Sequence, residues 1–502
     1  MNTTAEVKMW GTSIGAVTLP EGQKYASFEY NPSFLQTGIQ VSPITMPLGS
    51  GIFRFPNLSY ESFFGLPGFL ADSLPDKFGN QLINAWLSKQ GRLPKSFNAV
   101  ERLCYTGNRG MGALEFYPLL QNQNDSGEAL NVQNLVELAS LVLQNRQNLK
   151  SVLDECDKKN LNQELAKIIK IGTSAGGARA KAVIAFNPAT KEVRSGQVQT
   201  KKGFEHWLIK FSGVSGNKDK ENDDELDFGL VEYAYYLMAK SAGIDMSQCY
   251  LLDDGKNQHF MTKRFDRTTD GKKLHMQTLA GLCHFDFNQA ASNSYEQVFS
   301  VMNRLELYYP EKLDFFKRMI FNVMVCNCDD HVKNVSFLMD KTGKWKLAPF
   351  YDVCFAYNPA GKWTSRHQMT INGKTSNFII EDFNQCAKIA SLRKKDVADA
   401  IYQVKSAVSK WQIFAEQVGV RPEMSSAIER CFVKYIFKSA PVTKPILNLL
   451  FFTWSIYPES SVGLFNSVEK VNYPLAMIYD VSKIDFNNLM RYEMDELVSM
   501  EQ

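Results

Sequence analysis

The segment Asn327-Cys-Asp-Asp-His-Val-Lys-Asn-Val335 decides the fold. An apolar stripe at helical spacing precedes it and ends at Met324, and a short hairpin pattern follows it up to Leu347. Asp329 and Asn334 have the D-x-x-x-x-N spacing of a phosphotransfer loop, in which the aspartate accepts the hydroxyl proton and the asparagine binds Mg²⁺. The same residue types also occur in ordinary solvated loops, so the neighbouring motifs must decide.

A second magnesium carboxylate is expected after the hairpin, and Asp352 in Pro349-Phe-Tyr-Asp352 supplies one. His331 and Lys333 lie inside the loop, where either side chain could neutralise the γ-phosphate in the transition state. A structural hydrogen-bonding role for His331 is equally consistent with the pattern. The remaining histidines have no metal-ligand spacing and no Gly-x-Ser-x-Gly elbow is present, so zinc chemistry and serine hydrolysis have no support.

Upstream lies a glycine-rich segment, Gly172-Thr-Ser-Ala-Gly-Gly-Ala-Arg-Ala-Lys181. Glycines let backbone N–H groups approach an anion closely, and Arg179 and Lys181 add positive charge, so the segment suits nucleotide phosphates. It is not a Walker A motif, because Gly177 is followed by Ala178. Alone, such a segment is more often a simple turn.

Lys210 is the charged residue of an apolar strand pattern that runs from His206 to Phe211. A strand lysine can hold the α- and β-phosphates of a nucleotide when a carboxylate fixes its rotamer, and Glu232 on the next amphipathic helix is a candidate partner. Alternatively, Lys210 snorkels at a sheet edge. The glycine loop, strand lysine, D-x-x-x-x-N loop, hairpin and Asp352 nevertheless occur in the order of a kinase-like phosphotransferase.

Composition limits the classes of partner. The formal net charge is +3, which is too balanced for a generic nucleic-acid coat or a polybasic membrane binder. The nine cysteines form no Cys-x-x-Cys pair and are interpreted as reduced thiols of an intracellular protein. Glu6 and Lys8 interrupt any signal-peptide core, and the apolar stretch from Ile446 to Ile456 is well short of the ~18 to 20 residues that span a bilayer. A cytoplasmic protein without membrane contact is expected.

The chain has 502 residues, which suggests about three packed units. The predicted fold is α+β. Short strand patterns and turn signals predict a β-rich N-terminal domain, a polar linker at 121–127 ends it, and helical spacing from Val132 to about Lys170 follows. The predicted domains are 1–125, the β-rich unit; 126–435, a core with a nucleotide lobe to about 270 and a helical lobe after it; and 436–502, a C-terminal extension of unknown role.

These residues resemble a known family, the HipA-type serine/threonine protein kinases of bacterial toxin–antitoxin modules. The resemblance covers about residues 5 to 435 in the family's order. Each matching stretch is unspecific by itself, and together they are specific. The stretches are Phe69-Leu-Ala-Asp-Ser-Leu-Pro-Asp-Lys-Phe-Gly79, Gly110-Met-Gly-Ala-Leu114, Ala175-Gly-Gly-Ala-Arg-Ala-Lys181, Lys263-Arg-Phe-Asp-Arg267, Asp329-Asp-His-Val-Lys-Asn334 and Leu347-Ala-Pro-Phe-Tyr-Asp352.

The resemblance implies a protein-kinase-like core of two lobes, preceded by the β-rich domain, with ATP and Mg²⁺ between the lobes. It implies that Asp329 is the catalytic base and that Ser174, beside Thr173, is autophosphorylated, which ejects the loop and silences the kinase. The other implied roles are magnesium binding by Asn334 and Asp352, phosphate binding by Lys210, adenine contact by the backbone from Lys263 to Phe265, and nucleotide binding by Ala175, Gly176, Gly177, Ala178, Arg179, Lys181 and Glu232.

The resemblance further implies a growth-arresting toxin that phosphorylates a translation protein such as an aminoacyl-tRNA synthetase. Its partner would be a small helix-turn-helix antitoxin of the HipB type, so that DNA is met only indirectly. Asp330 departs from the family pattern and is expected to add negative charge beside the base, whereas Arg179 and Ala180 replace a more usual Gln-Glu pair. Two alternatives stay open: a catalytically weak nucleotide-binding corepressor and a small-molecule phosphotransferase.

Overall fold

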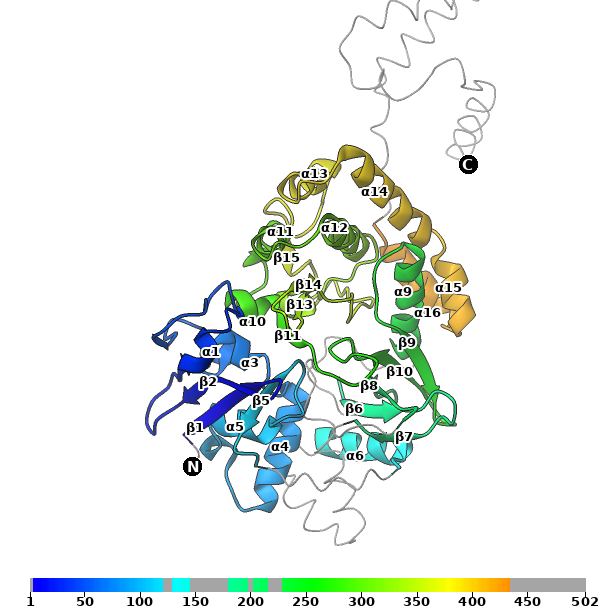
Figure 1. The fold of residues 1–502 in the computed structure, drawn as a ribbon. Coiled ribbons are helices and arrows are strands. Elements are labelled where there is room, and N and C mark those ends of the chain that lie inside the picture. The colour runs from blue at the N-terminus through cyan, green and yellow to red at the C-terminus, as the bar shows by residue number, and fades with distance from the viewer. Residues whose placement is uncertain (1–2, 121–128, 145–178, 197–201, 215–227, 434–502) are drawn as a thin grey trace, which may run out of the picture. The chain divides into compact units, whose positions relative to one another are not determined.

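The computed structural model describes residues 3–120, 129–144, 179–196, 202–214 and 228–433, all within one compact unit (Figure 1). The predicted linker at 121–127, the second part of the predicted helix that begins at Val132, and the predicted extension at 436–502 lie outside the described residues.

The N-terminal region is built on a five-stranded sheet with the strand order β4-β3-β2-β1-β5, in which every pairing is antiparallel. The alternation of apolar and polar residues predicted all of these strands except β4, which is too short for a pattern. The strands are β1 (Thr4–Met9), β2 (Thr12–Thr18), β3 (Ser27–Tyr30), β4 (Ile52–Phe53) and β5 (Leu114–Tyr117).

Helices occupy more of this region than the prediction of a β-rich domain allowed. The prolines and glycines between 64 and 79 favoured a loop, yet that segment contains a short helix and leads into a long one. The capping box of Asn98 and Glu101 starts another. The helices are α1 (Pro32–Leu35), α2 (Tyr60–Phe63), α3 (Gly68–Ala71), α4 (Lys77–Lys89), the 3₁₀ turn η1 (Pro94–Ser96) and α5 (Ala99–Thr106).

A second five-stranded antiparallel sheet, in the order β7-β6-β8-β10-β9, forms the lobe that was predicted to bind the nucleotide and is called the nucleotide lobe below. The helix α9 (Phe228–Ser241) packs against β10 and β9, and α6 (Val132–Gln144) contributes to an apolar core with β6 and β8. The strands are β6 (Lys181–Phe186), β7 (Val193–Ser195), β8 (Glu205–Lys210), β9 (Cys249–Asp253) and β10 (Gln258–Lys263).

The core beneath this second sheet crosses the predicted domain boundary. Phe78, Leu82 and Leu87 of α4 are buried in one apolar cluster with Leu135 of α6 and Ile209 of β8. In Figure 1, α4 and α6 lie next to each other below the two sheets, and they are in contact. The long helix of the N-terminal region is therefore part of the nucleotide lobe's own core.

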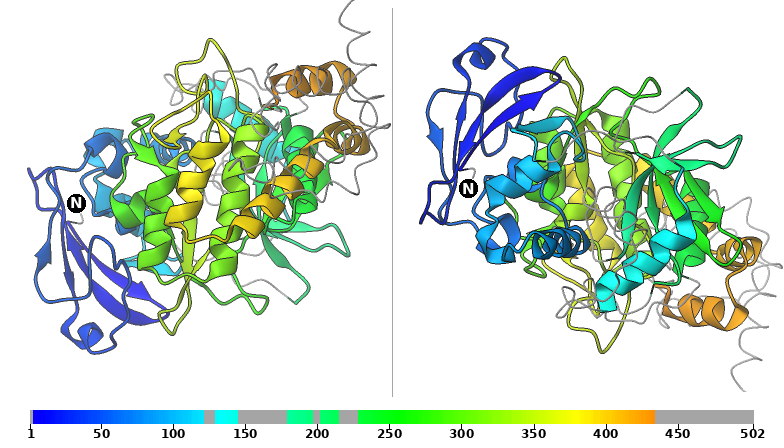
Figure 2. Two further views of the ribbon diagram at one scale, coloured as in Figure 1. Left: turned by 90° about the horizontal axis from the view of Figure 1, so that it is seen from above. Right: turned by 90° about the horizontal axis from the view of Figure 1, so that it is seen from below.

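The remaining described residues form the helical lobe, seen from two sides in Figure 2. The predicted hairpin is confirmed as β13 and β14, and β13 also pairs with β11, which gives a three-stranded sheet in the order β11-β13-β14. The lobe's elements are β11 (His275–Thr278), α10 (Leu279–Cys283), β12 (Asn293–Ser294), α11 (Tyr295–Arg304), α12 (Tyr309–Met324), η2 (Val332–Asn334), β13 (Ser336–Met339), β14 (Trp345–Leu347), β15 (Met369–Thr370), α13 (Ile380–Ile389), α14 (Lys394–Val408), α15 (Trp411–Val418) and α16 (Pro422–Cys431).

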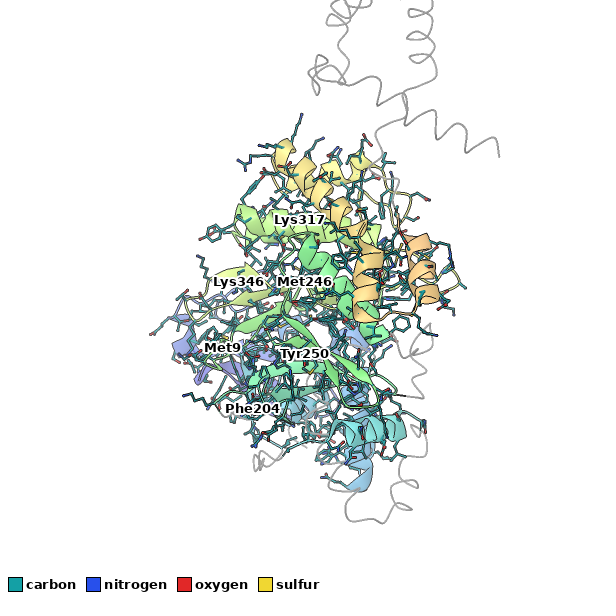
Figure 3. The ribbon with its side chains drawn as sticks, turned by 90° about the vertical axis from the view of Figure 1, so that its right-hand side faces the viewer. Met9, Phe204, Met246, Tyr250, Lys317 and Lys346 are labelled. Carbon is teal, nitrogen blue, oxygen red and sulfur yellow. The ribbon has the colours of Figure 1, made fainter. Side chains whose placement is uncertain are left out.

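The two lobes meet along the segment that follows α9. Met246 forms an isolated parallel bridge with Phe350, and Figure 3 places it between Tyr250 of β9 and Lys317 of α12.

Among the helices of the described part of the chain, none is long and apolar enough to cross a membrane.

Candidate active site

Lys210 lies at the end of β8 with its ammonium between two carboxylates. Its Nζ is 2.5 Å from Oε1 of Glu232 on α9 and 2.5 Å from Oδ1 of Asp352. The predicted pairing of the strand lysine with the helix glutamate is confirmed. The alternative of a snorkelling edge lysine is wrong, because only 8% of the Lys210 side chain is exposed.

In this cluster Lys210 and the Asp352 carboxylate each stabilise the charged form of the other. Burial would lower the pKa of Lys210, but Asp352 and Glu232 raise it above its ordinary value, so the ammonium stays charged. Burial would likewise raise the pKa of Asp352, but Lys210 and Lys181 hold it well below its usual range. Asp352 is therefore a carboxylate at neutral pH. Its backbone φ of 55° lies in the left-handed region, which is uncommon for a residue other than glycine and recurs at functional sites.

A hydrogen bond within their loop joins Asn334 to Asp329. The Nδ2 of Asn334 donates a hydrogen bond of 2.8 Å to the backbone carbonyl of Asp329, which leaves Oδ1 of Asn334 as the acceptor atom of the amide. The Asp329 carboxylate accepts a hydrogen bond of 2.9 Å from Nε1 of Trp363, and 41% of its side chain is exposed. The spacing within the loop gave no signal for Trp363, which lies 34 positions further along the chain.

Asp329 has an environment suited to a proton acceptor. The surrounding protein raises the pKa of its carboxyl group by desolvation, and the nearby Asp352 adds to that, whereas His331 opposes it. Nε2 of His331 lies 3.8 Å from Oδ1 of Asp329. Nδ1 of His331 is buried and has no hydrogen-bond partner within the described residues. The structural role considered for His331 therefore has no bond to support it, and its electrostatic role stays a prediction.

Lys333 has its described contacts outside the loop, and its expected neutralisation of the transferred phosphate stays a prediction. Its ammonium lies 4.2 Å from the centroid of the Phe287 ring. Burial lowers the pKa of Lys333, and the charges that oppose this effect come from Asp72 and Asp76 of the N-terminal region. Carboxylates and an aromatic face outside the loop, rather than the loop itself, decide where this cation goes.

The described end of the glycine-rich segment reaches two carboxylates. Nη1 of Arg179 is 3.4 Å from Oε2 of Glu232, and Nζ of Lys181 is 3.5 Å from Oδ2 of Asp76. Ser174, Ala175, Gly176, Gly177 and Ala178 lie outside the described residues.

The backbone expected to face adenine is partly occupied by the protein. The N–H of Lys263 donates to the carbonyl of Gln248 at 2.8 Å, and the carbonyl of Lys263 accepts from the hydroxyl of Ser247 at 2.6 Å. The Phe265 ring packs against Tyr351, with a centroid distance of 5.4 Å. Adenine contact by the backbone from Lys263 to Phe265 stays a prediction.

Asp330 is turned into the helical lobe, and its charge still raises the pKa of Asp329, as was expected of a carboxylate beside the base. The residue is 2% exposed, and its carboxylate accepts hydrogen bonds from the Tyr295 hydroxyl at 2.8 Å and the Gln368 backbone N–H at 2.7 Å. Nδ1 of His367 lies 2.9 Å from Oδ2 of Asp330. This anchor holds the segment that contains Trp363 against the loop of Asp329 and Asn334.

The Asp330–His367 pair predicts a stability that depends on pH. Burial would lower the pKa of His367, but Asp330 raises it to about 10, against ~6.5 for an unfolded chain. The stabilisation is therefore complete below about pH 6.5 and is lost as the pH rises towards about 10, at up to roughly 1.4 kcal/mol per pH unit. Urea unfolding from pH 6 to pH 10 checks this. His367→Gln should show a shallower decline than the wild type, and equal slopes would contradict the assignment.

Family models match most of the described chain. The HipA N-terminal domain matches residues 5–117, and the HipA-like C-terminal domain matches residues 173–411. The second match contains Asp329, Asn334, Asp352 and the Lys210–Glu232 pair.

Individual relatives agree with these matches. A protein of Haemophilus influenzae named "Putative kinase" is 30% identical over 134 residues, which cover 24% of this chain and 39% of that relative. "Putative kinase Y4dM" of Sinorhizobium fredii is 24% identical over 160 residues, 29% of this chain and 36% of the relative. The matches thus span less than two fifths of either relative. HipA in the Shewanella oneidensis MR-1 complex of HipA, HipB and operator DNA has a similar fold, with a TM-score of 0.57 and 16% identity over 85% of this chain and 94% of that one.

Proposed function

Since this chain belongs to the HipA family, we propose that it is an ATP- and Mg²⁺-dependent serine/threonine protein kinase and the toxin of a toxin–antitoxin pair. One observation carries the proposal: Lys210 is held between Glu232 and Asp352, at 2.5 Å from each. In protein kinases a strand lysine pairs with a helix glutamate while an aspartate after the catalytic loop binds the metal. A structural ion pair would not require the D-x-x-x-x-N loop as well.

The donor set suits magnesium. Asn334 Oδ1 and the Asp352 carboxylate are hard oxygen donors, and the described residues contain no group of three His, Cys, Asp or Glu side chains that could form a metal cage. Mg²⁺ keeps several waters and binds through one or two protein oxygens together with substrate phosphates. When bound, the ion neutralises phosphate charge. Asn334 and Asp352 would hold it, and Lys210, Arg179 and Lys181 would face the phosphates of ATP.

Phosphoryl transfer then needs few protein groups. The hydroxyl oxygen of a serine or threonine attacks the γ-phosphorus, its proton passes to the Asp329 carboxylate, and the bond from the γ-phosphorus to the bridging oxygen breaks to release ADP. Desolvation raises the pKa of Asp329, which makes it a better proton acceptor. The hydrogen bond from Trp363 holds one carboxylate oxygen in place, so the other faces the hydroxyl.

The proposed physiological partners follow from the family. The similar HipA fold comes from a complex with HipB and operator DNA, which supports a small helix-turn-helix antitoxin as partner and DNA contact only through it. The proposed substrate is a translation protein such as an aminoacyl-tRNA synthetase, and the proposed location is the cytoplasm. Lys263 and Phe265 remain the proposed adenine contacts.

Incubation of the purified chain with γ-labelled ATP, Mg²⁺ and a cell lysate tests the activity. Label in a discrete protein band, on serine or threonine, is the expected result. Label only in small molecules would instead identify a small-molecule phosphotransferase. Nucleotide binding without any label transfer would identify a nucleotide-binding corepressor.

Ser174 is predicted to become phosphorylated when the chain is incubated with Mg²⁺ and ATP. A dianionic phosphate there would compete with the ATP phosphates for Arg179 and Lys181. Mass spectrometry should therefore find phosphate on the 172–181 peptide, with a matching loss of kinase activity. Ser174→Ala should stay active for longer, and Thr173→Ala is the matched control. An unmodified peptide after prolonged incubation would contradict the prediction.

A further inference from the structure

Two lysines lie side by side at the nucleotide site. Lys181 and Lys210 are partners in the antiparallel register of β6 and β8, so both side chains leave the same face of the sheet. Both side chains are buried, with exposures of 2% and 8%. Two buried like charges on directly opposite residues of neighbouring strands destabilise the sheet unless each has a counter-ion.

The counter-ions of the two lysines come from different parts of the chain. Lys210 has Glu232 and Asp352, both in the kinase-like core. Lys181 has a single direct ion pair among the described residues, with Asp76 of the N-terminal region at 3.5 Å. Burial lowers the pKa of Lys181 and Lys210 lowers it further, whereas Asp76, the largest opposing influence, and then Asp352 raise it. The charge on Lys181 thus depends first on a carboxylate supplied by the N-terminal region.

Asp76 is held rigidly in its place. It precedes α4, where its Oδ1 accepts the backbone N–H of Gly79 at 2.6 Å and its carbonyl accepts the N–H of Asn80 at 2.8 Å, which is N-cap geometry. Its Oδ2 is buried and has no hydrogen-bond partner in the described part of the chain. That oxygen is the one that faces Lys181. Because the apolar face of α4 is buried in the core of the nucleotide lobe, the carboxylate cannot swing away.

A second contact fixes the segment that carries Asp76. The Asp72 carboxylate accepts hydrogen bonds from the backbone N–H and the hydroxyl of Thr278, at the start of α10, at 2.8 Å each. Glycine is required on both sides of this contact, because a Cβ at Gly68 would lie 2.3 Å from the Gly281 carbonyl and a Cβ at Gly281 would lie 2.1 Å from Asp72. The N-terminal region is therefore docked closely on the core, just before Asp76.

We propose that Asp76 is a positioning residue of the nucleotide site: it holds Lys181 charged and beside Lys210, so that both ammonium groups face the phosphates of a bound nucleotide. This inference rests on the proposed function and adds that the N-terminal region completes the phosphate site. Asp76 touches no phosphate itself and acts through Lys181, its direct ion-pair partner, while its charge also raises the pKa of Lys333. Without it, Lys181 would lose its proton or leave its position next to Lys210.

Asp76→Asn isolates the charge, because asparagine caps a helix as well as aspartate does. We expect the full-length variant to bind Mg²⁺–ADP roughly ten- to hundredfold more weakly in calorimetry, the range for one charge-assisted contact, and to show a raised KM for ATP with a smaller change in kcat. Asp382→Asn is the matched control, since Asp382 also caps a helix, α13, and pairs with a lysine, Lys374, in the helical lobe. It should leave Mg²⁺–ADP affinity unchanged.

A double-mutant cycle separates positioning from a general loss of structure. In a Lys181→Met background, Asp76→Asn should weaken Mg²⁺–ADP binding no further, because Asp76 acts through that lysine. Unchanged affinity in the single variant, or additive losses in the double variant, would overturn the inference. If Asp76→Asn does not fold, Asp76→Ser, a neutral cap, goes through the same cycle. Wild-type protein that neither binds nucleotide nor transfers phosphate would refute the proposed function instead.

Discussion

Asp329→Asn is expected to lower kcat for phosphoryl transfer by about 10²- to 10⁴-fold, the usual contribution of a general base. The change removes the proton acceptor and little else. An asparagine Oδ1 can still accept the hydrogen bond of 2.9 Å from Nε1 of Trp363, and the backbone carbonyl that Asn334 binds is unaffected. Affinity for Mg²⁺–ADP should therefore stay close to that of the wild type. Initial rates with γ-labelled ATP and calorimetry with Mg²⁺–ADP measure the two quantities.

Asp340→Asn provides the matched control for this experiment. Asp340 lies in the turn between β13 and β14, where its carboxylate accepts the backbone N–H of Thr342 at 2.8 Å and that of Lys344 at 3.2 Å. The variant removes a carboxylate from the hairpin that follows the Asp329 loop without touching the reacting groups, so kcat should be unchanged. Wild-type rates in Asp329→Asn would show that the proton leaves by another route and that Asp329 is not the base.

Asp330→Asn is expected to destabilise the fold by about 3 to 5 kcal/mol at pH 7, because it leaves the buried charge of His367 without its partner. The carboxylate accepts three interactions, from Tyr295, His367 and Gln368, and the amide nitrogen of an asparagine can accept none. Urea unfolding followed by circular dichroism measures the loss. The variant should also reduce kcat, since the released segment contains Trp363, which orients Asp329.

Asp254→Asn is the matched control for the expected loss of kcat in Asp330→Asn. Asp254 pairs with another fully buried histidine, His259, at 2.9 Å, but the pair lies in the hairpin of β9 and β10. Its loss should cost stability without lowering the kcat of the protein that remains folded. In the double variant Asp330→Asn with His367→Leu, part of the lost stability should return, because no unpaired charge stays buried. A stability equal to that of the wild type in Asp330→Asn would contradict the anchoring role.

Much of the fold was predictable because its information is local. Alternating apolar residues marked the strands, the stripe that ends at Met324 marked α12, and the turn at Asp340 marked the hairpin. The pairing of Lys210 with Glu232 was also predictable, since a charged residue in an apolar strand requires a counter-ion and the next helix offers one. The helices between Tyr60 and Thr106 were missed because the prolines and glycines among them favoured loops.

The sequence alone therefore determined the order of the chemistry: a glycine-rich segment, a strand lysine, the loop of Asp329 and Asn334, and the carboxylate of Asp352. Only the tertiary structure decided where the other charges point. Asp330 and Lys333 lie in one loop and carry opposite charges. The side chain of each contacts a residue far away in the chain, His367 for Asp330 and Phe287 for Lys333. Asp76 and Lys181 lie 105 positions apart in the chain, and no local pattern links the two. A buried charge is placed by whichever opposite charge the folded core brings near it, because burial without a partner costs more than any local preference supplies.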